Sequence, residues 1–112
     1  MFPSQRRSKY GNVRSDYNGR TFASKREADT AGELDMLRKA KDPKQRVVDV
    51  EYQYRMPLVV NGLKIATYVA DFKVTFFDKH TEIWDAKGMR TVVYTLKAKL
   101  VKALYGIDIK EV

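Results

Sequence analysis

Apolar and polar residues alternate in the middle of the chain, and this pattern predicts a β-hairpin over residues 65–88. β-branched and aromatic residues dominate both halves of the segment, as is typical of strands. The polar triplet at 78–80, which holds the only histidine, is expected to form the turn between them. Folding the chain about this turn brings Asp71 opposite residues 86–88.

The same alternation sorts the charged residues of the hairpin by face. Side chains two positions apart in a strand point the same way, so Asp85 and Lys87 share a face. Asp71 is expected to meet them from the opposite strand. Two carboxylates and an ammonium therefore converge on one small patch.

The segments on either side of the hairpin predict two helices and further strands. The order is helix, three strands, helix, strand, which indicates an α+β fold in one domain covering residues 1–112. Pro57 predicts an edge strand or a bulge, because proline cannot donate a backbone hydrogen bond. Asn61-Gly62 predicts a tight turn that leads into the strand from Leu63. The expected elements are a small hairpin at 13–22, a helix from Ser24 to about Ala40, strands from Val47 to Arg55 and from Leu63, a helix at 92–105 and a strand at 107–112.

Both helices carry signals at their ends. Ser24 and Glu27 match a Ser-x-x-Glu capping box, in which the glutamate has a purely structural role. Thr91 is expected to cap the second helix, and Gly106 to end it. The second helix is expected to bury an apolar stripe made of Val92, Val93, Leu96, Leu100, Ala103 and Leu104. In the strand at 47–55, Val48, Val50, Tyr52 and Tyr54 are expected to share one face.

Composition limits the class of protein. The 112 residues suffice for one core. No apolar run approaches the ~20 residues that span a bilayer, and the N-terminus lacks the apolar stretch of a secretory signal. The chain has no cysteine, so a disulfide and a thiolate metal site are excluded, and the cytoplasm is the expected compartment.

A net charge of +8 favours a polyanionic partner, with nucleic acid first and an anionic membrane second. Residues 1–10 are expected to form a flexible basic arm that lies along phosphates or serves only as a solubilising tail. The lysines of the second helix either contact phosphates or form a solvated face. The expected phosphate contacts are Arg6, Arg7, Lys9, Arg90, Lys97, Lys99 and Lys102.

Carboxylates without cysteine or clustered histidine favour a hard cation, Mg²⁺ or Mn²⁺. Asp71 and Asp85 are expected to share one such ion, which would lower the pKa of a bound water. Lys87 would stabilise the charge that develops on a phosphate. Zinc is not expected.

The residues of this patch resemble a known signature. Asp71, thirteen further residues and then Asp85-Ala86-Lys87 are similar to the Asp…(Asp/Glu)-x-Lys pattern of the PD-(D/E)xK nuclease superfamily. Segments 22–28 and 85–91 resemble those of small phage-encoded proteins placed in that superfamily. The resemblance covers most of the chain from about Tyr10. Ala70 stands where the pattern usually has proline.

The resemblance implies a restriction-endonuclease-like αβββαβ core, in which two helices flank a mixed central sheet. It implies an Mg²⁺- or Mn²⁺-dependent DNA endonuclease that acts in the host cytoplasm on branched DNA, such as a Holliday junction, during replication or recombination. Glu27, Asp71 and Asp85 would be the metal ligands, and Lys87 would complete the catalytic set. Gln53 is a possible accessory residue or simply a solvated side chain.

Two other functions stay open. The chain is either a DNA-binding module that keeps the nuclease fold without cutting, or a structural or adaptor protein whose charge is incidental. In the last case, the charged patch would be a surface salt bridge across a hairpin.

A symmetric homodimer is expected, because one small domain carries one active site and cutting both strands takes two. Trp84 lies on the face opposite Asp85, and we expect it to be exposed and covered by a second copy. Glu82 shares that face and is expected to take no part in the site.

Overall fold

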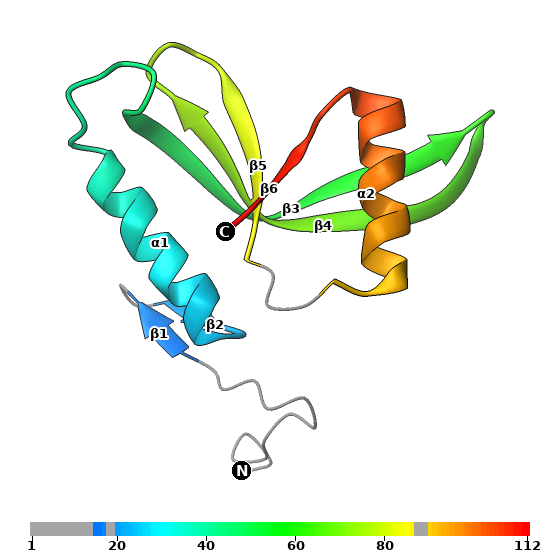
Figure 1. Cartoon of the computed structure of the whole chain (residues 1–112), viewed down its shortest axis with the longest axis horizontal. Coiled ribbons are helices and arrows are strands. Elements are labelled where there is room, and N and C mark those ends of the chain that lie inside the picture. Colours follow the sequence, from blue (N-terminus) through cyan, green and yellow to red (C-terminus); the bar gives the residue numbers. More distant parts are fainter. Residues whose placement is uncertain (1–14, 18–19, 87–89) are drawn as a thin grey trace.

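Two long antiparallel strands, at residues 47–60 and 63–76, lie at the centre of the fold. The first is longer than predicted, because the alternation of buried and exposed side chains continues beyond residue 55. The computed structural model describes residues 15–17, 20–86 and 90–112. Along the chain the elements are β1 (Ser15–Tyr17), β2 (Arg20–Phe22), α1 (Lys25–Leu37), β3 (Val47–Val60), β4 (Leu63–Phe76), β5 (Thr81–Asp85), α2 (Val92–Tyr105) and β6 (Ile109–Glu111) (Figure 1).

The main sheet has four strands in the order β3-β4-β5-β6. β3, β4 and β5 pair antiparallel, and β6 pairs parallel to β5, so the sheet is mixed. β1 and β2 form a separate small hairpin. The α+β class, the mixed sheet with two helices and the element order after β2 are as predicted. The predicted arm at 1–10 and the turn at 18–19 lie outside the described residues.

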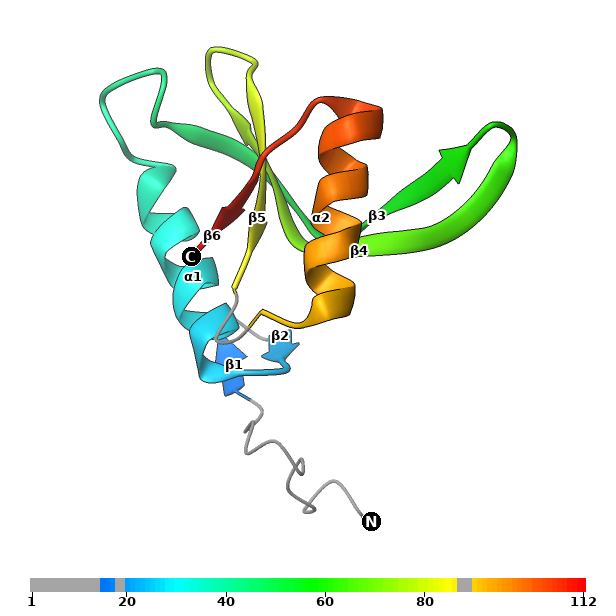
Figure 2. The same cartoon turned by 45° about the vertical axis from the view of Figure 1, so that its right-hand side comes forward.

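The helices begin where the capping residues predict. The Ser24 hydroxyl accepts a hydrogen bond from the Glu27 N–H at 3.2 Å, and the Thr91 hydroxyl accepts one from the Tyr94 N–H at 3.0 Å. α2 ends at Gly106, as expected, whereas α1 ends at Leu37 and so falls short of the expected Ala40. Figures 1 and 2 both show β5 and β6 running between α1 and α2.

Two hydrophobic clusters hold these elements together, one under each helix. The α1 cluster contains Phe22, Ala28, Ala31, Leu34, Val47, Phe72, Val74, Phe76 and Trp84. The α2 cluster contains Met56, Leu58, Tyr68, Ala70, Ile83, Tyr94 and Val101. The long hairpin of β3 and β4 therefore contributes to both.

The hairpin changes from one cluster to the other at Asp71. Phe72 and Val74 belong to the α1 cluster, whereas Tyr68 and Ala70, which have the same parity on β4, belong to the α2 cluster. The change-over therefore falls between Ala70 and Phe72.

β3 changes cluster at the same level. Tyr52 packs against the α1 cluster and Tyr54 against the α2 cluster. Gln53, between them, has a φ of +53°, which side chains other than glycine seldom adopt. Such backbone strain persists only where surrounding structure holds it in place, and it often marks a functional site.

The prediction of which side chains of β3 share a buried face is wrong at the start of the strand. A register shift between Val47 and Asp49 turns Val48 outwards, and Val47 is the buried residue. The strand also extends to Val60, past the expected end at Arg55. Pro57 lies on an edge strand of the sheet, as predicted.

The predicted buried stripe of α2 is wrong except at Leu100, which is half-buried and packs against the α2 cluster. Its other five members, Val92, Val93, Leu96, Ala103 and Leu104, are exposed, and Tyr94 and Val101 are the buried residues of the helix. Tyr94 fixes this rotation, because its ring packs near Tyr68 and its hydroxyl donates to Glu111 at 3.0 Å. An aromatic residue with a bonded hydroxyl thus takes the place that the aliphatic side chains were expected to fill.

Trp84 is 4 % exposed and packs in the α1 cluster, so the prediction of an exposed tryptophan is wrong. The final strand is shorter than expected and covers only Ile109–Glu111. Neither helix in the described part of the chain is long and apolar enough to cross a membrane.

The end of α2 gives a prediction for stability. Gly106 has a φ of +71°, and an added Cβ would meet no atom within 4 Å. Gly106→Ala is therefore expected to lower the free energy of unfolding by about 1 kcal/mol through backbone strain alone. Gly106→Asn should cost less, since asparagine tolerates this conformation better. Equal stability of all three proteins in urea unfolding would contradict this explanation.

Candidate active site

Three carboxyl groups from three different elements converge at the level where the hairpin changes cluster. Glu27 lies in the first turn of α1, Asp71 in the middle of β4 and Asp85 at the end of β5. Glu27 and Asp85 are buried, with exposed fractions of 6 % and 2 %, and Asp71 is half-buried. We call these three residues the carboxyl centre.

Asp71 and Asp85 are in direct contact. The Asp71 carboxyl shares a hydrogen bond with the Asp85 carboxyl, and its Oδ2 accepts a second one from the Ala86 N–H at 2.9 Å. Burial raises the pKa of Asp71 to about 7, helped by the hydrogen bond and the negative charge of Asp85 and, less strongly, by the charge of Glu27. The Ala86 N–H opposes this rise. Two acids this close favour sharing one proton in the absence of a cation.

Glu27 faces the same centre. Burial raises its pKa first, and the charge of Asp85 raises it further. Its Oε2 accepts a hydrogen bond from Gln53 Nε2 at 3.2 Å, which opposes the rise. The Glu27 backbone completes half of the predicted capping box with Ser24, while its side chain is directed to the strained residue on β3. Glu27 therefore does more than cap the helix.

Tyr68 is a site residue that the sequence pattern did not reveal. Its hydroxyl donates to Asp85 Oδ2, and burial, together with this hydrogen bond, raises the pKa of Tyr68. Tyr68 is three residues from Asp71, so simple alternation places the two side chains on opposite faces of β4. Only the change-over of the hairpin between the two clusters brings Tyr68 to the carboxyl centre.

The register of the β4–β5 hairpin differs slightly from the prediction. Phe72 pairs with Trp84, so Asp71 aligns with Asp85 and not with residues 86–88. The turn accounts for the difference, because the Phe76 N–H donates to the His80 carbonyl and closes the hairpin earlier. His80 lies in the turn, as expected.

Glu82 lies with Trp84, as the alternation predicts. Its Oε1 accepts a hydrogen bond from Trp84 Nε1 at 2.8 Å, and its Oε2 lies 3.0 Å from His80 Nε2. Glu82 thus serves the hairpin turn and is not among the charges that shift the pKa of Asp71 or Glu27.

The expected phosphate contacts have mixed outcomes. Lys87 and the cations of the arm, Arg6, Arg7 and Lys9, lie outside the described residues. Arg90 pairs with Glu111 at 3.0 Å, and Lys102 pairs with Asp108 at 2.9 Å. Lys97 donates to the Thr67 carbonyl at 3.1 Å, and Lys99 is exposed. Three of the four cations in and before α2 therefore have partners within the chain.

The carboxyl centre has oxygen donors of the kind that Mg²⁺ and Mn²⁺ prefer. Within residues 15–17, 20–86 and 90–112, no three or more His, Cys, Asp or Glu form a group that could hold a metal ion. The carboxyls are instead hydrogen-bonded within the chain. A cation at Asp71 and Asp85 would remove the repulsion that raises the pKa of Asp71, with Glu27 as the third acid beside them.

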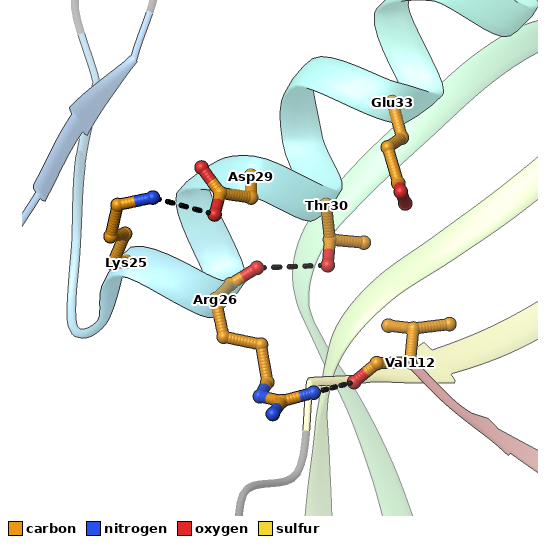
Figure 3. A pocket seen from close by; sticks show the side chains of 6 residues that line it. All are labelled: Lys25, Arg26, Asp29, Thr30, Glu33 and Val112. Carbon is orange, nitrogen blue, oxygen red and sulfur yellow. Dashed lines mark hydrogen bonds and ion pairs between the residues drawn. The ribbon is translucent and has the colours of Figure 1, made fainter.

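A shallow pocket of about 380 Å³ lies between α1 and Val112 at the end of the chain (Figure 3). Its charges are largely satisfied: Lys25 pairs with Asp29 at 3.0 Å, and Arg26 donates to the Val112 carbonyl at 3.1 Å. It contains none of the three acids of the carboxyl centre. The lining residues are Lys25, Arg26, Asp29, Thr30, Glu33 and Val112.

The family described as “Protein of unknown function (DUF1064)” matches residues 7–111. The chain belongs to this family. The match to DUF1064 includes both helices, all strands and the carboxyl centre. No curated protein and no solved structure matches the chain.

The raised pKa of Asp71 predicts how stability depends on pH in the absence of metal. Between the ordinary pKa of an aspartate, 3.8, and the folded value of about 7, the native state binds more protons than the unfolded state. Stability should therefore fall as pH rises through this interval. We expect the melting temperature in EDTA to decrease from about pH 5 to about pH 8.

Asp71→Asn tests this assignment. Glu27, whose pKa is raised by burial, and His80, whose pKa is raised by its hydrogen bonds to Asp78 and Glu82, contribute a dependence of the same sign. The variant keeps both groups, so its melting temperature should depend on pH less steeply, but not become independent of it. An unchanged slope would show that Asp71 is not the titrating group.

Proposed function

We propose that this protein is a metal-dependent DNA endonuclease with a restriction-endonuclease-like core. One observation carries the proposal: Glu27, Asp71 and Asp85, from α1, β4 and β5, lie so close together that the negative charge of Asp85 raises the pKa of both Glu27 and Asp71. Placing three acids together is costly for a fold unless a cation or a proton compensates them. The element order and the mixed sheet agree with the core that the sequence resemblance implies.

The chain's own residues would prepare the centre for an ion. The Ala86 N–H fixes Asp71, the Tyr68 hydroxyl fixes Asp85, and Gln53 orients Glu27. Bound there, Mg²⁺ or Mn²⁺ would polarise a phosphate oxygen and favour ionisation of a water molecule. Lys87 follows Asp85 by two residues, and we assign it to the charge that develops on the phosphate.

DNA is the proposed substrate because a net charge of +8 attracts a polyanion, while the three acids of the carboxyl centre would hold the metal ion that phosphodiester cleavage needs. Branched DNA, such as a four-way junction, is the substrate class that the resemblance favours. Arg6, Arg7, Lys9 and Lys99 are the proposed phosphate contacts, together with Arg90, Lys97 and Lys102 where DNA displaces their partners within the chain.

A second candidate is a DNA-binding module that keeps this fold without cutting. It is favoured by the hydrogen bonds that each carboxyl makes within the chain and by the lack, in the described residues, of a three-ligand metal group. In that case the acids would share protons and serve only the fold.

The deciding experiment is cleavage of labelled linear, flapped and four-way DNA with Mg²⁺, Mn²⁺ or EDTA. We expect Asp71→Asn and Asp85→Asn to lose at least about 100-fold in metal-dependent cleavage, as removal of a group that stabilises the transition state typically does. DNA binding should persist, because both changes remove negative charge. Wild-type rates in both variants would show that the site is wrong.

Glu27→Gln and Glu82→Gln form a matched pair. Both replace an acid by its amide, but only Glu27 faces the carboxyl centre, whereas Glu82 accepts from Trp84. Cleavage should be lost in Glu27→Gln and kept in Glu82→Gln, at equal melting temperatures. Wild-type protein that binds four-way DNA but cuts none of the substrates with either metal would support the binding module instead.

Binding itself should weaken steeply with salt. Each neutralised phosphate releases counterions, with a slope near −0.9 per contact on duplex DNA in a plot of log K against log salt. Lys99→Gln should reduce that slope by about 1 if Lys99 contacts a phosphate. A flat titration of the wild-type protein between ~50 and ~200 mM salt would remove DNA from its partners.

A further inference from the structure

The hairpin of β3 and β4 projects beyond α2 as a narrow two-stranded ribbon (Figures 1 and 2). In the described part of the chain, β5 pairs with β4 only at residues 72–75, so the hairpin beyond Ala70 consists of β3 and β4 alone. α2 packs on the nearer part of this ribbon, where the Tyr105 hydroxyl donates to the Pro57 carbonyl at 2.6 Å. We call residues 59–65, which lie beyond this contact and belong to neither hydrophobic cluster, the ribbon tip.

The ribbon tip has a tight turn and presents aliphatic side chains to the solvent. Asn61 and Gly62 have φ values of +51° and +79°, as in the two-residue turn that matches the twist of a hairpin. Leu63 is 66 % exposed and Ile65 51 % exposed. A register shift after Leu58 leaves Ile65 without a partner residue on β3, and such a bulge re-aims the side chain of the extra residue. The ribbon therefore ends in two aliphatic side chains that the described chain does not cover.

The ribbon and the helix that packs on it contain no acidic residue. Neither aspartate nor glutamate occurs from residue 52 to 70 or from residue 86 to 107. The two segments lie together, because α2 is bonded to the ribbon through Tyr105 and through Lys97, which donates to a carbonyl of β4. Among the described residues, Arg55, Lys64 and Lys99 are exposed cations that form no ion pair. Aliphatic side chains at the end of the ribbon are thus combined with cations that attract phosphates.

We propose that the ribbon tip packs against an unstacked base pair at a branch point of DNA, and so selects branched DNA over a continuous duplex. This inference rests on the proposed function, which supplies DNA as the partner. The cations match the phosphates, whereas Leu63 and Ile65 match base faces. In a continuous duplex those faces are covered by stacked neighbours, and the grooves present mainly polar base edges. Leucine and isoleucine are among the side chains that proteins insert between base steps.

The dimensions of the ribbon suit this role. At about 3.3 Å per residue, segment 57–60 extends about 13 Å past the contact with α2, which exceeds the ~8.5 Å depth of the major groove. Leu63 and Asp71 lie on the same strand, and the segment between them spans at most about 26 Å. At about 3.4 Å per base pair, one DNA molecule would contact the ribbon tip and the carboxyl centre with at most about eight base pairs between them.

Binding in EDTA tests this role without any cleavage. The probes are a four-way junction and a linear duplex whose ends are closed by the same hairpin loops, so that they differ only in the branch point. Wild-type protein should bind the junction at least about tenfold more tightly. Leu63→Ser/Ile65→Ser should lose this preference, because both apolar contacts are removed. Met36→Ser/Val48→Ser removes two exposed apolar side chains away from the tip and should keep it, at the same melting temperature.

Lys64→Gln separates the effect of charge from branch recognition. This variant should bind both DNAs more weakly by the same factor, and its slope of log K against log salt should be smaller by about 1. 2-Aminopurine, a fluorescent adenine analogue, reports unstacking when it is placed at the branch point. Its fluorescence should rise when wild-type protein or Lys64→Gln saturates the junction, but not with Leu63→Ser/Ile65→Ser.

Equal affinity of the wild-type protein for both DNAs, or a preference kept by Leu63→Ser/Ile65→Ser, would overturn the proposal. Flotation with phosphatidylglycerol vesicles, or dimerisation in sedimentation, that this double variant abolishes would assign the ribbon tip to a membrane or to a second copy and also overturn it. A protein that recognises the junction through its tip but cleaves no DNA with Mg²⁺ or Mn²⁺ would contradict the proposed nuclease and support the role of the tip. Wild-type cleavage of both DNAs by the double variant would contradict the role of the tip alone.

Discussion

One β-hairpin serves two hydrophobic cores, and this constraint determines the rest of the structure. β3 and β4 are each 14 residues long, and each contributes first to the cluster under one helix and then to the cluster under the other. Where the strands pass from the cluster under α1 to the cluster under α2, neither helix covers them completely. Polar side chains can be placed there without breaking a core, and the three acids lie at this level.

The change-over also explains why the acids keep defined positions despite their repulsion. The strained backbone of Gln53 presents its amide to Glu27, and Ala86 and Tyr68 hold the two aspartates. Hydrogen bonds to carboxyl groups are among the stronger ones in proteins. The surrounding clusters therefore fix the donors, and the donors fix the acids.

Local signals in the sequence were sufficient to predict the order of the elements and the convergence of Asp71 and Asp85, whereas Glu27 was assigned to the site through the family resemblance. Ser24, Thr91 and Gly106 act through contacts within a few residues of themselves, so the start of both helices and the end of α2 follow from the sequence. The convergence of Asp71 and Asp85 needs only a turn of known position and the alternation of a strand. These features do not depend on what lies on the other side of the sheet.

Features that depend on tertiary packing could not be predicted in the same way. The rotation of α2 is set by Tyr94, which packs near Tyr68 and bonds to Glu111, both distant in sequence. An apolar stripe shows that a helix face seeks cover, but it does not show whether its own chain provides it. Tyr68 was missed because strict alternation fails where the hairpin changes cluster.

The position of Tyr68 has a consequence for communication within the molecule. Its ring lies 6.3 Å from that of Tyr94 on the inner face of α2, and its hydroxyl holds Asp85. A tilt of α2 would displace Tyr94, then Tyr68 and then the carboxylate. If a partner tilted this helix on binding, and if a cation bound at the carboxyl centre as proposed, each would therefore change the affinity of the other by the same factor.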